Sequence, residues 1–306
     1  MNTETYAAWL RGQGRRVVQS AGSYWHSAPM RTLQAFPYHQ LLEPAEEELG
    51  ALLRSQRVVG LRYSSAASAP VGCPSYHVVY EASSYDLDRL GKRTRHNVRL
   101  GLRDSSIEPI AFSLLANDGW RLSLDTLHRQ GRSLRRTERA WRRMWDLAAE
   151  LPGFEAWGAF HKGQLAATHV WFRMNDTHCL VHAQSLRQFH RYEVNKALAF
   201  TTIKAMVDRG DGPLFFGVES LDAPPSVDQF KFLMGAAAKP VRQRVLFRSA
   251  LRPFLGRSAH VLLRLARRLR PQSSAFAKAD GLMRFYLEAA EWPGPHAAAG
   301  PIENAS

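Results

Sequence analysis

The most regular pattern of hydrophobic positions lies in the second half of the chain, where three apolar runs follow one another at short intervals. These runs cover Ala156 to His161, Leu165 to Phe172 and Cys179 to Gln184. The pairs Lys162-Gly163 and Asn175-Asp176 lie between them, and Gly, Asn and Asp are favoured in tight hairpin turns. The pattern predicts a meander of three antiparallel strands.

Helices and further strands are expected on both sides of this meander. Apolar residues three and four positions apart predict helices, and short continuous apolar runs predict strands. We expect helices over residues 44–53, 87–102, 122–151, 192–209 and 226–234, and strands over residues 57–63, 76–80, 107–112, 214–218 and 241–247. The polar start of the chain predicts neither. This order is typical of a mixed α/β (α+β) fold with a mainly antiparallel sheet flanked by helices.

The length and the local composition predict how the chain is divided. A chain of 306 residues is long enough for two units at about 150 residues each. We expect a small N-terminal α/β unit over residues 1–84, a larger α/β domain over 85–250 and a basic helical extension over 251–290. Residues 291–306, rich in Pro, Gly and Ala, are expected to form a disordered tail.

The charge of the chain is strongly positive and predicts anionic partners. Lys and Arg outnumber Asp and Glu by 41 to 27, which gives a formal net charge of +14. The excess is concentrated in four clusters, namely residues 92–103, 129–143, 187–191 and 242–270. Phosphate-bearing ligands, RNA or an anionic membrane surface would each explain it. The alternative is a set of solvated helix faces in an arginine-rich sequence.

The chain lacks the usual signals for secretion, membrane insertion or metal binding. Cys73 and Cys179 lie far apart and match no disulfide or metal spacing, so we expect no metal site. No uncharged apolar stretch approaches the 18 or so residues of a spanning helix, and the N-terminal segment resembles no signal peptide. A cytoplasmic location is expected.

The segment from Leu255 to Arg270 alternates leucines with arginines. A basic amphipathic helix of this composition can lie on an anionic membrane surface. The protein would then be peripheral at the inner face of the membrane. Packing of this helix against the N-terminal unit is the alternative.

The order of elements and four local sequences resemble the GNAT acyltransferase superfamily, and in particular its Fem-type and BioF2-like acetyltransferase branch. The resemblance covers roughly residues 85 to 250, and the small N-terminal unit resembles a reduced first copy of the GNAT domain. The four sequences are Leu90-Gly91-Lys92-Arg93-Thr94-Arg95-His96-Asn97-Val98-Arg99, Gly163-Gln164-Leu165-Ala166-Ala167, Asn195-Lys196-Ala197-Leu198 and Phe230-Lys231-Phe232-Leu233-Met234-Gly235.

This resemblance implies transfer of an acyl group to an amine acceptor, with acyl-coenzyme A or, in the alternative, aminoacyl-tRNA as the anionic donor. In GNAT enzymes a glycine-containing loop before a helix binds the pyrophosphate of coenzyme A. The matching loop here, residues 184–192, has no glycine, which makes close backbone approach harder. The helix N-terminus and polar side chains can still bind an anion. The expected donor-binding residues are Arg187, Gln188, Arg191 and Asn195.

The resemblance also implies a catalytic lysine. Phe230-Lys231 matches the Phe-Lys pair that brings a lysine near the reacting carbonyl in Fem-type enzymes, where a fixed cation stabilises a developing oxyanion. An ion pair with Asp228, three residues earlier, is the alternative role for Lys231. The expected catalytic residue is therefore Lys231, with Phe230 at the substrate.

The amine must lose a proton, and this requires a carboxylate or an imidazole close to the acceptor. Glu219 follows an apolar strand whose burial would raise its pKa. A structural pairing of Glu219 with an arginine is equally consistent with the sequence. His182 is the second candidate, and it is expected on the same strand face as His178.

Lys92, Arg95 and Arg99 form one stripe of a predicted helix. Such a stripe can bind phosphates of a substrate, or it can be a solvated face. The sequence therefore predicts an N-acyltransferase whose acceptor, an unidentified amine, could belong to a cell-envelope or polysaccharide precursor. The alternative is a non-catalytic RNA-binding or nucleotide-binding protein, or a peripheral membrane adaptor, on the same fold.

Overall fold

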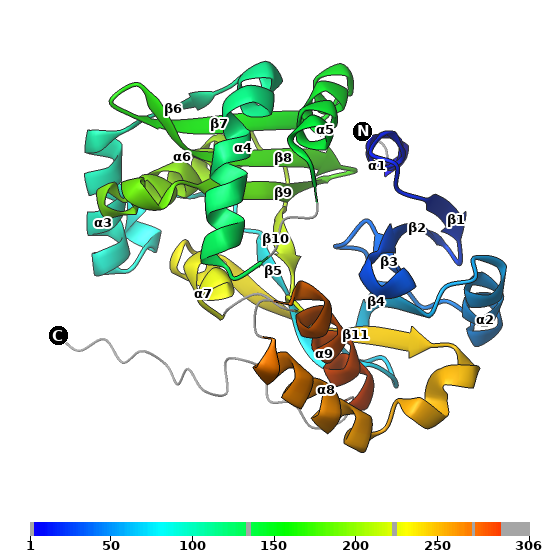
Figure 1. Cartoon of the computed structure of the whole chain (residues 1–306). Coiled ribbons are helices and arrows are strands. Elements are labelled where there is room, and N and C mark those ends of the chain that lie inside the picture. The colour runs from blue at the N-terminus through cyan, green and yellow to red at the C-terminus, as the bar shows by residue number, and fades with distance from the viewer. Residues whose placement is uncertain (1–2, 133–135, 222–224, 271–272, 289–306) are drawn as a thin grey trace.

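A computed structural model describes residues 3–288 except for 133–135, 222–224 and 271–272. Its centre is one sheet of eleven strands, in the order β1-β2-β3-β4-β11-β5-β10-β9-β8-β7-β6. The predicted disordered tail at 291–306 lies outside the described residues. The mixed, mainly antiparallel sheet flanked by helices is the predicted fold class (Figure 1).

The predicted meander is present, with the two expected turns. Strands β7 (Phe154–His161), β8 (Gln164–Met174) and β9 (Thr177–Ser185) pair antiparallel in sequence order. Lys162, Gly163 and Asn175 in the turns have positive φ angles, which fits the two-residue hairpin connection. The remaining strands are β1 (Val17–Ser20), β2 (Ser23–Ala28), β3 (Thr32–Phe36), β4 (Gly60–Ala66), β5 (Cys73–Tyr80), β6 (Ser106–Pro109), β10 (Leu214–Val218) and β11 (Ala237–Phe247).

The helices cover both faces of the sheet. Helices α3 (Lys92–Asp104) and α6 (Val194–Asp208) pack against each other on one face, and α4 (Phe112–Arg129) and α5 (Glu138–Glu150) pack on the other (Figure 1). The short helix α7 (Pro225–Leu233) follows β10. The outer helices are α1 (Thr3–Gly12), α2 (Glu46–Ser55), α8 (Arg257–Leu269) and α9 (Ser274–Leu287).

Strand β11 joins the two halves of the sheet. On one side it pairs with β4, where Val241 lies opposite Ala66, and on the other with β5, where Ala237 lies opposite Val79. Strand β5 also pairs with β10. Strands that come before and after residue 84 therefore belong to one continuous hydrogen-bonded sheet. The predicted domain boundary at residue 84 stays a prediction.

Three sequence predictions about elements need correction. The first 43 residues contain α1, β1, β2 and β3, whose short apolar stretches gave no clear period. The long helix predicted over 122–151 is two helices, because α4 ends at Arg129 and the side chain of Thr137 caps the start of α5 by accepting from the amide of Ala140. The strand predicted over 107–112 ends at Pro109, and Phe112 begins α4.

Helix α1 is packed into the same core as α5. Trp9 is 3% exposed, and its indole Nε1 donates to the backbone carbonyl of Met144 at 2.9 Å. Its ring lies 6.2 Å from the ring of Trp145, and Tyr6 lies 5.2 Å from Phe172 on β8. The N-terminal helix is therefore an integral part of the wall beside β8 and β9.

The Trp9→Ala variant should be destabilised by about 3–5 kcal/mol, because it leaves a cavity in the core. Urea unfolding followed by circular dichroism measures the change. Leu41→Ala, at a side chain that is 43% exposed, should change the free energy of unfolding by less than about 0.5 kcal/mol. Equal losses in the two variants would contradict the packing of α1 described above.

Candidate functional site

The site begins where two parallel strands separate. Strands β9 and β10 are paired at His178–Leu214 and Cys179–Phe215. Beyond these pairs β9 continues to Ser185 and β10 to Val218 without further pairing between them. Side chains and backbone groups of both strands therefore face a gap in the middle of the sheet.

Two cavities lie at this gap. The first, which we call the basic cavity, has a volume of about 490 Å³ and is bordered by residues 180–182 of β9 and 216–218 of β10. The second, the loop cavity, has a volume of about 450 Å³ and is bordered by residues 183–185 of β9 and the start of α6. Val227 of α7 contributes to both walls. Helix α7 therefore lies between the two cavities.

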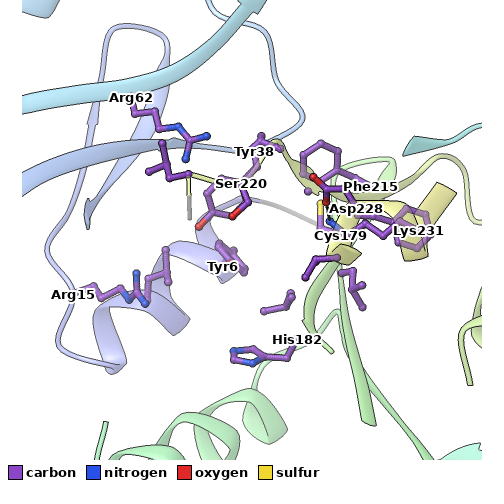
Figure 2. Close-up of a pocket in the computed structure, with 18 of the residues that line it drawn as sticks. Tyr6, Arg15, Tyr38, Arg62, Cys179, His182, Phe215, Ser220, Asp228 and Lys231 are labelled. Atoms are coloured by element: carbon purple, nitrogen blue, oxygen red, sulfur yellow. Dashed lines mark hydrogen bonds and ion pairs between the residues drawn. The ribbon is translucent and has the colours of Figure 1, made fainter. Parts of the chain in front are cut away.

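Two neighbouring residues of α7 line different cavities. Phe230 lines the loop cavity, and Lys231 lines the basic cavity (Figure 2). Gly217 of β10, at φ +127°, faces Lys231, and a Cβ atom at that glycine would lie 3.8 Å from the Lys231 Nζ atom. The absence of a side chain at Gly217 leaves space beside the ammonium group.

Lys231 is held by a buried carboxylate. Its Nζ atom donates to the Asp228 Oδ1 atom at 2.8 Å, which is the ion pair that their spacing of three residues allows. The hydroxyl of Tyr76 on β5 donates to the Asp228 Oδ2 atom at 2.9 Å. Burial and the neighbouring Asp228 carboxylate raise the pKa of Tyr76 far above its usual value, so this hydroxyl stays a donor. The ammonium group of Lys231 is thereby fixed in position.

The basic cavity collects cations from distant parts of the chain. Its described wall contains one acidic residue, Asp228, beside Lys231 and the further cationic residues Arg15, Arg62, Arg132, Arg136 and Lys278. Arg15 contacts the His26 Nδ1 atom at 3.4 Å, and Arg136 donates to the Gln13 Oε1 atom at 3.3 Å. Neither guanidinium group has a carboxylate partner among the described residues. The cavity is therefore suited to an anionic ligand.

His182 and Lys231 both lie in the wall of the basic cavity (Figure 2). Its ring packs edge-on against Trp141 and Trp145 of α5, and it has no hydrogen-bond partner in the described part of the chain. Burial, together with the positive charges of Arg136 and Arg15, lowers the pKa of His182 to about 3. The imidazole is neutral at neutral pH.

The expectation that His182 and His178 share one strand face is wrong. Val170 lies opposite His182 whereas Trp171 lies opposite Leu180, so that Val181 is an extra residue in β9. Such a bulge shifts the alternation of side chains by one position. His182 consequently faces the tryptophans of α5, whereas His178 lies 3.9 Å from Asp211.

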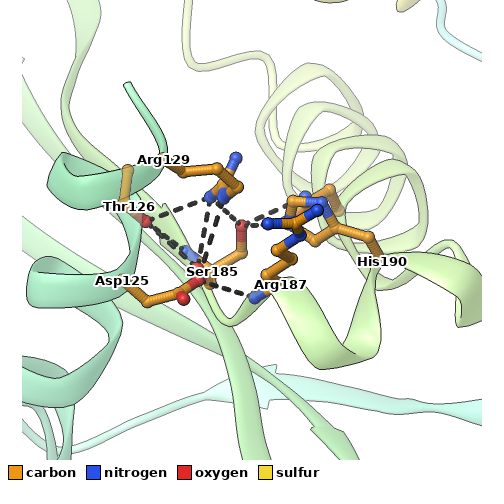
Figure 3. A network of polar contacts seen from close by, with 7 residues as sticks. Asp125, Thr126, Arg129, Ser185, Arg187 and His190 are labelled. Atoms are coloured by element: carbon orange, nitrogen blue, oxygen red, sulfur yellow. Dashed lines mark hydrogen bonds and ion pairs between the residues drawn. The ribbon is translucent and has the colours of Figure 1, made fainter. Parts of the chain in front are cut away.

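A polar network organises the loop cavity around Ser185 (Figure 3). The Ser185 hydroxyl contacts the His190 Nε2 atom at 2.9 Å, and it accepts from Arg129 at 3.2 Å and from the Asn195 side chain at 3.2 Å. Thr126 of α4 accepts from the Ser185 amide at 3.0 Å. These contacts fix the end of β9 to α4 and to the start of α6.

The residues predicted to bind the donor are only partly in this cavity. Asn195 lines it, whereas Arg187, Gln188 and Arg191 are exposed on the short helical turn η3 (Arg187–Tyr192) and lie outside its wall. The backbone amide of Arg187 donates to the Asp125 Oδ2 atom at 2.6 Å. The resemblance implies that the amides of this loop bind a pyrophosphate, but the amide of Arg187 already donates to a carboxylate.

Glu219 lies behind the basic cavity and not in its wall. Its Oε2 atom accepts from the Ser75 hydroxyl at 2.8 Å, and its Oε1 atom accepts from Arg284 of α9 at 2.8 Å. Burial raises the pKa of Glu219, and the cation of Arg284 opposes this. Glu219 is 5% exposed, and its carboxylate forms an ion pair with Arg284. This is the structural pairing with an arginine that the sequence analysis gave as the alternative.

The predicted phosphate-binding stripe on α3 borders neither cavity. Lys92 and Arg99 are exposed, and Arg95 forms an ion pair with Asp88 at 2.7 Å. The structure thus brings Lys231, His182, Phe230 and Asn195 to the gap between β9 and β10, and it leaves the α3 stripe on the outer surface.

Sequence reasoning missed the residues that come from the N-terminal helix and from its following loop. Tyr6 and Arg15 reach the basic cavity together with Tyr38, whose hydroxyl contacts the His26 Nε2 atom at 2.8 Å. Their segment shows no strong period, so nothing local indicated a site. The cluster of positive charge at 129–143 was the available signal, because it contains Arg132 and Arg136.

Solved structures share this fold. The chain is similar to the C-terminal domain (DUF2156) of a protein assigned as a lysylphosphatidylglycerol synthetase from Agrobacterium fabrum, at 12% identity and a TM-score of 0.55, covering 86% of this chain and 91% of that one. It is similar to FemX at 11% identity and a TM-score of 0.55, covering 85% and 92%. A GCN5-related N-acetyltransferase from Kribbella flavida gives 11% identity, a TM-score of 0.46, and coverage of 81% and 96%.

At these identities the likeness shows a common fold and no more. The GNAT-like, Fem-type fold expected from the sequence is thereby confirmed. No protein-family profile and no curated protein sequence matches the chain. Within the described residues, none of the helices combines the length and the hydrophobicity needed to cross a bilayer.

The pKa of His182 predicts a pH-dependent stability. The unfolded imidazole binds a proton below about pH 6.5, whereas the folded one does so only near pH 3. Stability is therefore lost as the pH falls through this window. Between about pH 7 and about pH 5, linkage gives a loss of about 2 kcal/mol from this residue.

Urea unfolding at these two pH values should show that His182→Gln loses about 2 kcal/mol less than the unmodified protein. His96→Gln, at an exposed residue of α3, is the matched control and should behave as the unmodified protein does. Identical pH dependence in all three proteins would contradict the buried, neutral state of His182.

Proposed function

We propose that the protein is an acyltransferase that moves an acyl or aminoacyl group to an amine, with the donor in the loop cavity and the acceptor in the basic cavity. The observation that carries this proposal is the position of α7 between the two cavities. Two substrates that enter from opposite sides can meet at its inner turn. Direct transfer requires such a ternary arrangement, in which the reacting atoms are held close together.

The chemistry is aminolysis of a thioester or an ester. The amine nitrogen forms a bond with the carbonyl carbon, the bond to the leaving sulfur or oxygen breaks, and the leaving group takes up the amine proton. Negative charge develops on the carbonyl oxygen during this reaction. Lys231 would stabilise it, because its ammonium group is fixed by Asp228 and lies beside the open space at Gly217.

His182 is the better of the two predicted proton acceptors. It lies in the wall of the same cavity as Lys231, whereas Glu219 has both oxygens engaged elsewhere. The low pKa of His182 keeps the imidazole neutral and able to accept a proton. The same low pKa makes the imidazole a weak base, so the role requires that a bound anionic substrate offset the positive charges of Arg15 and Arg136 and raise the pKa of His182.

The loop cavity favours an aminoacyl-tRNA over acyl-coenzyme A as the donor. The Asp125 carboxylate already accepts from the amide of Arg187, so this amide is not available to bind a pyrophosphate. An ester-linked aminoacyl group needs only the cavity beside Ser185 and Asn195. The exposed arginines of η3 would then contact the nucleic-acid backbone.

The basic cavity favours an acceptor that carries an acidic group in addition to its amine. Arg15 and Arg136 have no carboxylate partner within the described chain, and burial together with Arg15 lowers the pKa of Arg136. Two cations that repel each other at neutral pH gain most from a shared anion. A carboxylate or a phosphate of the acceptor is the chemistry that fits.

The Lys231→Ala variant should lose transfer activity by about 100-fold to 1,000-fold, the size of the effect when one oxyanion donor is removed. Activity is measured as the release of deacylated tRNA from aminoacyl-tRNA, and of free thiol from acetyl-coenzyme A, in the presence of a panel of amino acids and amino sugars. The matched control is Lys204→Ala, because Lys204 pairs with Asp208 on the exposed side of α6.

The control should keep full turnover and the unfolding temperature of the unmodified protein. Lys231→Ala leaves the buried Asp228 without its cation and should unfold at a lower temperature, so its activity is measured well below that temperature, where circular dichroism shows it folded. Unchanged turnover of Lys231→Ala would refute the catalytic role of Lys231. Salt-sensitive binding of tRNA by the unmodified protein without turnover of either donor would instead support the non-catalytic RNA-binding alternative.

The anion site can be tested without knowledge of the acceptor. Calorimetric titration with inorganic pyrophosphate should show binding that weakens at least 10-fold in Arg15→Gln combined with Arg136→Gln. Arg139→Gln, at an exposed residue of α5 three positions after Arg136, should bind as the unmodified protein does. Equal weakening in both variants would mean that the general positive charge, and not the cavity, attracts the anion.

A further inference from the structure

Helix α8 exposes the most extensive apolar surface among the residues that the structure describes. Four of its side chains, together with a phenylalanine just before it, are 52–76% exposed, namely Phe254, Val261, Leu262, Leu265 and Leu269. Among the other described residues, no large apolar side chain is more than 47% exposed. Contiguous exposed apolar surface of this kind marks a contact with another phase or another molecule.

The arrangement along α8 separates an inner face from an outer one. Ala259, His260, Leu263 and Ala266 are half-buried and lie on the side toward α9. His260 and Arg267 both contact Asp280 of α9. Helix α8 lies beside α9 (Figure 1), and these contacts attach it to the rest of the fold. The exposed leucines at 262, 265 and 269 follow helical spacing on the opposite side. The apolar face is thus turned outward by contacts that the structure shows.

Arginines border this apolar face. Arg257, Arg264 and Arg268 are exposed, and their spacing of seven and four residues places them along one edge of it. Arg264 and Arg268 also line a surface groove of about 320 Å³ with Arg267 and Asp280. Helix α8 has no acidic residue. An apolar strip beside a row of guanidinium groups is complementary to a surface with an apolar interior and anionic headgroups.

We propose that α8 docks the protein on an anionic lipid bilayer, with Phe254 and the exposed leucines at the acyl-chain boundary and the arginines at the lipid phosphates. The inference is independent of the proposed catalytic reaction. Helix α9, against which α8 packs, also contributes Lys278 to the wall of the basic cavity. With α8 docked, only α8 and α9 would lie between the bilayer and this wall of the basic cavity.

The same helix charge could attract RNA, and the same apolar strip could pair with a second copy of the chain. The observations favour the bilayer over both. RNA binding by a helix does not need four exposed aliphatic side chains, because phosphate contacts supply the affinity. A self-interface on this strip would bring the arginines of two copies close together.

Co-sedimentation with vesicles tests the proposal on the full chain. The unmodified protein should bind vesicles of phosphatidylcholine that contain phosphatidylglycerol, and it should bind pure phosphatidylcholine at least 10-fold more weakly. Leu262→Asp combined with Leu265→Asp should reduce binding to the anionic vesicles at least 10-fold. Arg264→Gln combined with Arg268→Gln should remove most of the preference for anionic lipid. All variants change exposed residues, so their unfolding temperatures should match that of the unmodified protein.

The control is Leu102→Asp on α3, a helix that is also rich in arginine and whose Leu102 is 38% exposed. It should leave vesicle binding unchanged. Four outcomes would overturn the proposal, and the first three concern vesicle binding and self-association. The first is full vesicle binding by the α8 leucine variant, and the second is an equal loss of vesicle binding in the α3 control. The third is that the unmodified protein is a dimer, which the leucine substitutions convert to a monomer without changing vesicle binding. Binding of tRNA but not of anionic vesicles, lost with the α8 arginines, would equally overturn it in favour of an RNA surface.

Discussion

The hydrogen bonding between β9 and β10 stops after two residue pairs, and the position of every candidate functional group depends on this. Had the strands continued to pair, their backbone groups would be used within the sheet and no gap would open. Because they separate after Cys179 and Phe215, β9 leads toward α6 and β10 leads toward α7. The extra residue Val181 in β9 turns His182 to the face of the gap that α5 covers. Both cavities follow from this separation.

Charge is distributed unequally between the two cavities, and this gives them different chemical characters. The loop cavity combines hydroxyl, amide and imidazole groups around Ser185 with the guanidinium group of Arg129, and a carboxylate lies at its loop. The basic cavity combines two arginines that have no carboxylate partner in the described chain with the Asp228–Lys231 pair. A site with one strongly cationic side and one side of mixed polar groups can distinguish an acidic acceptor from a large ester-linked donor.

The sequence predicted the part of the fold that has strong periodicity, because apolar alternation and turn residues are local properties. The meander, the helix predicted over 192–209 and the strand before Glu219 are of this kind. The α1 to β3 segment was missed because its strands are short and its apolar residues irregular. Burial of Trp9 against Met144 is a tertiary contact that no local pattern contains.

The candidate site could be predicted only where a resemblance or a residue type pointed to it. Lys231 and Phe230 were named from the resemblance, but their division between two cavities depends on how α7 sits between β9 and β10. Glu219 was named from its place after a strand, and its pairing with Arg284 requires a helix from the far end of the chain. The meeting of Arg15 with Arg136 likewise depends on the packing of α1 against α5.

Hydrogen–deuterium exchange with donor present is the measurement that tests the two-cavity account most directly. With excess aminoacyl-tRNA, and separately with acetyl-coenzyme A, the account predicts slower exchange at the end of β9, in η3, at the start of α6 and at the start of α7. The β1 to β3 strands should remain unchanged. Protection confined to the α3 stripe or to α8, with no change around Ser185 and Asn195, would contradict the assignment of the loop cavity as the donor site.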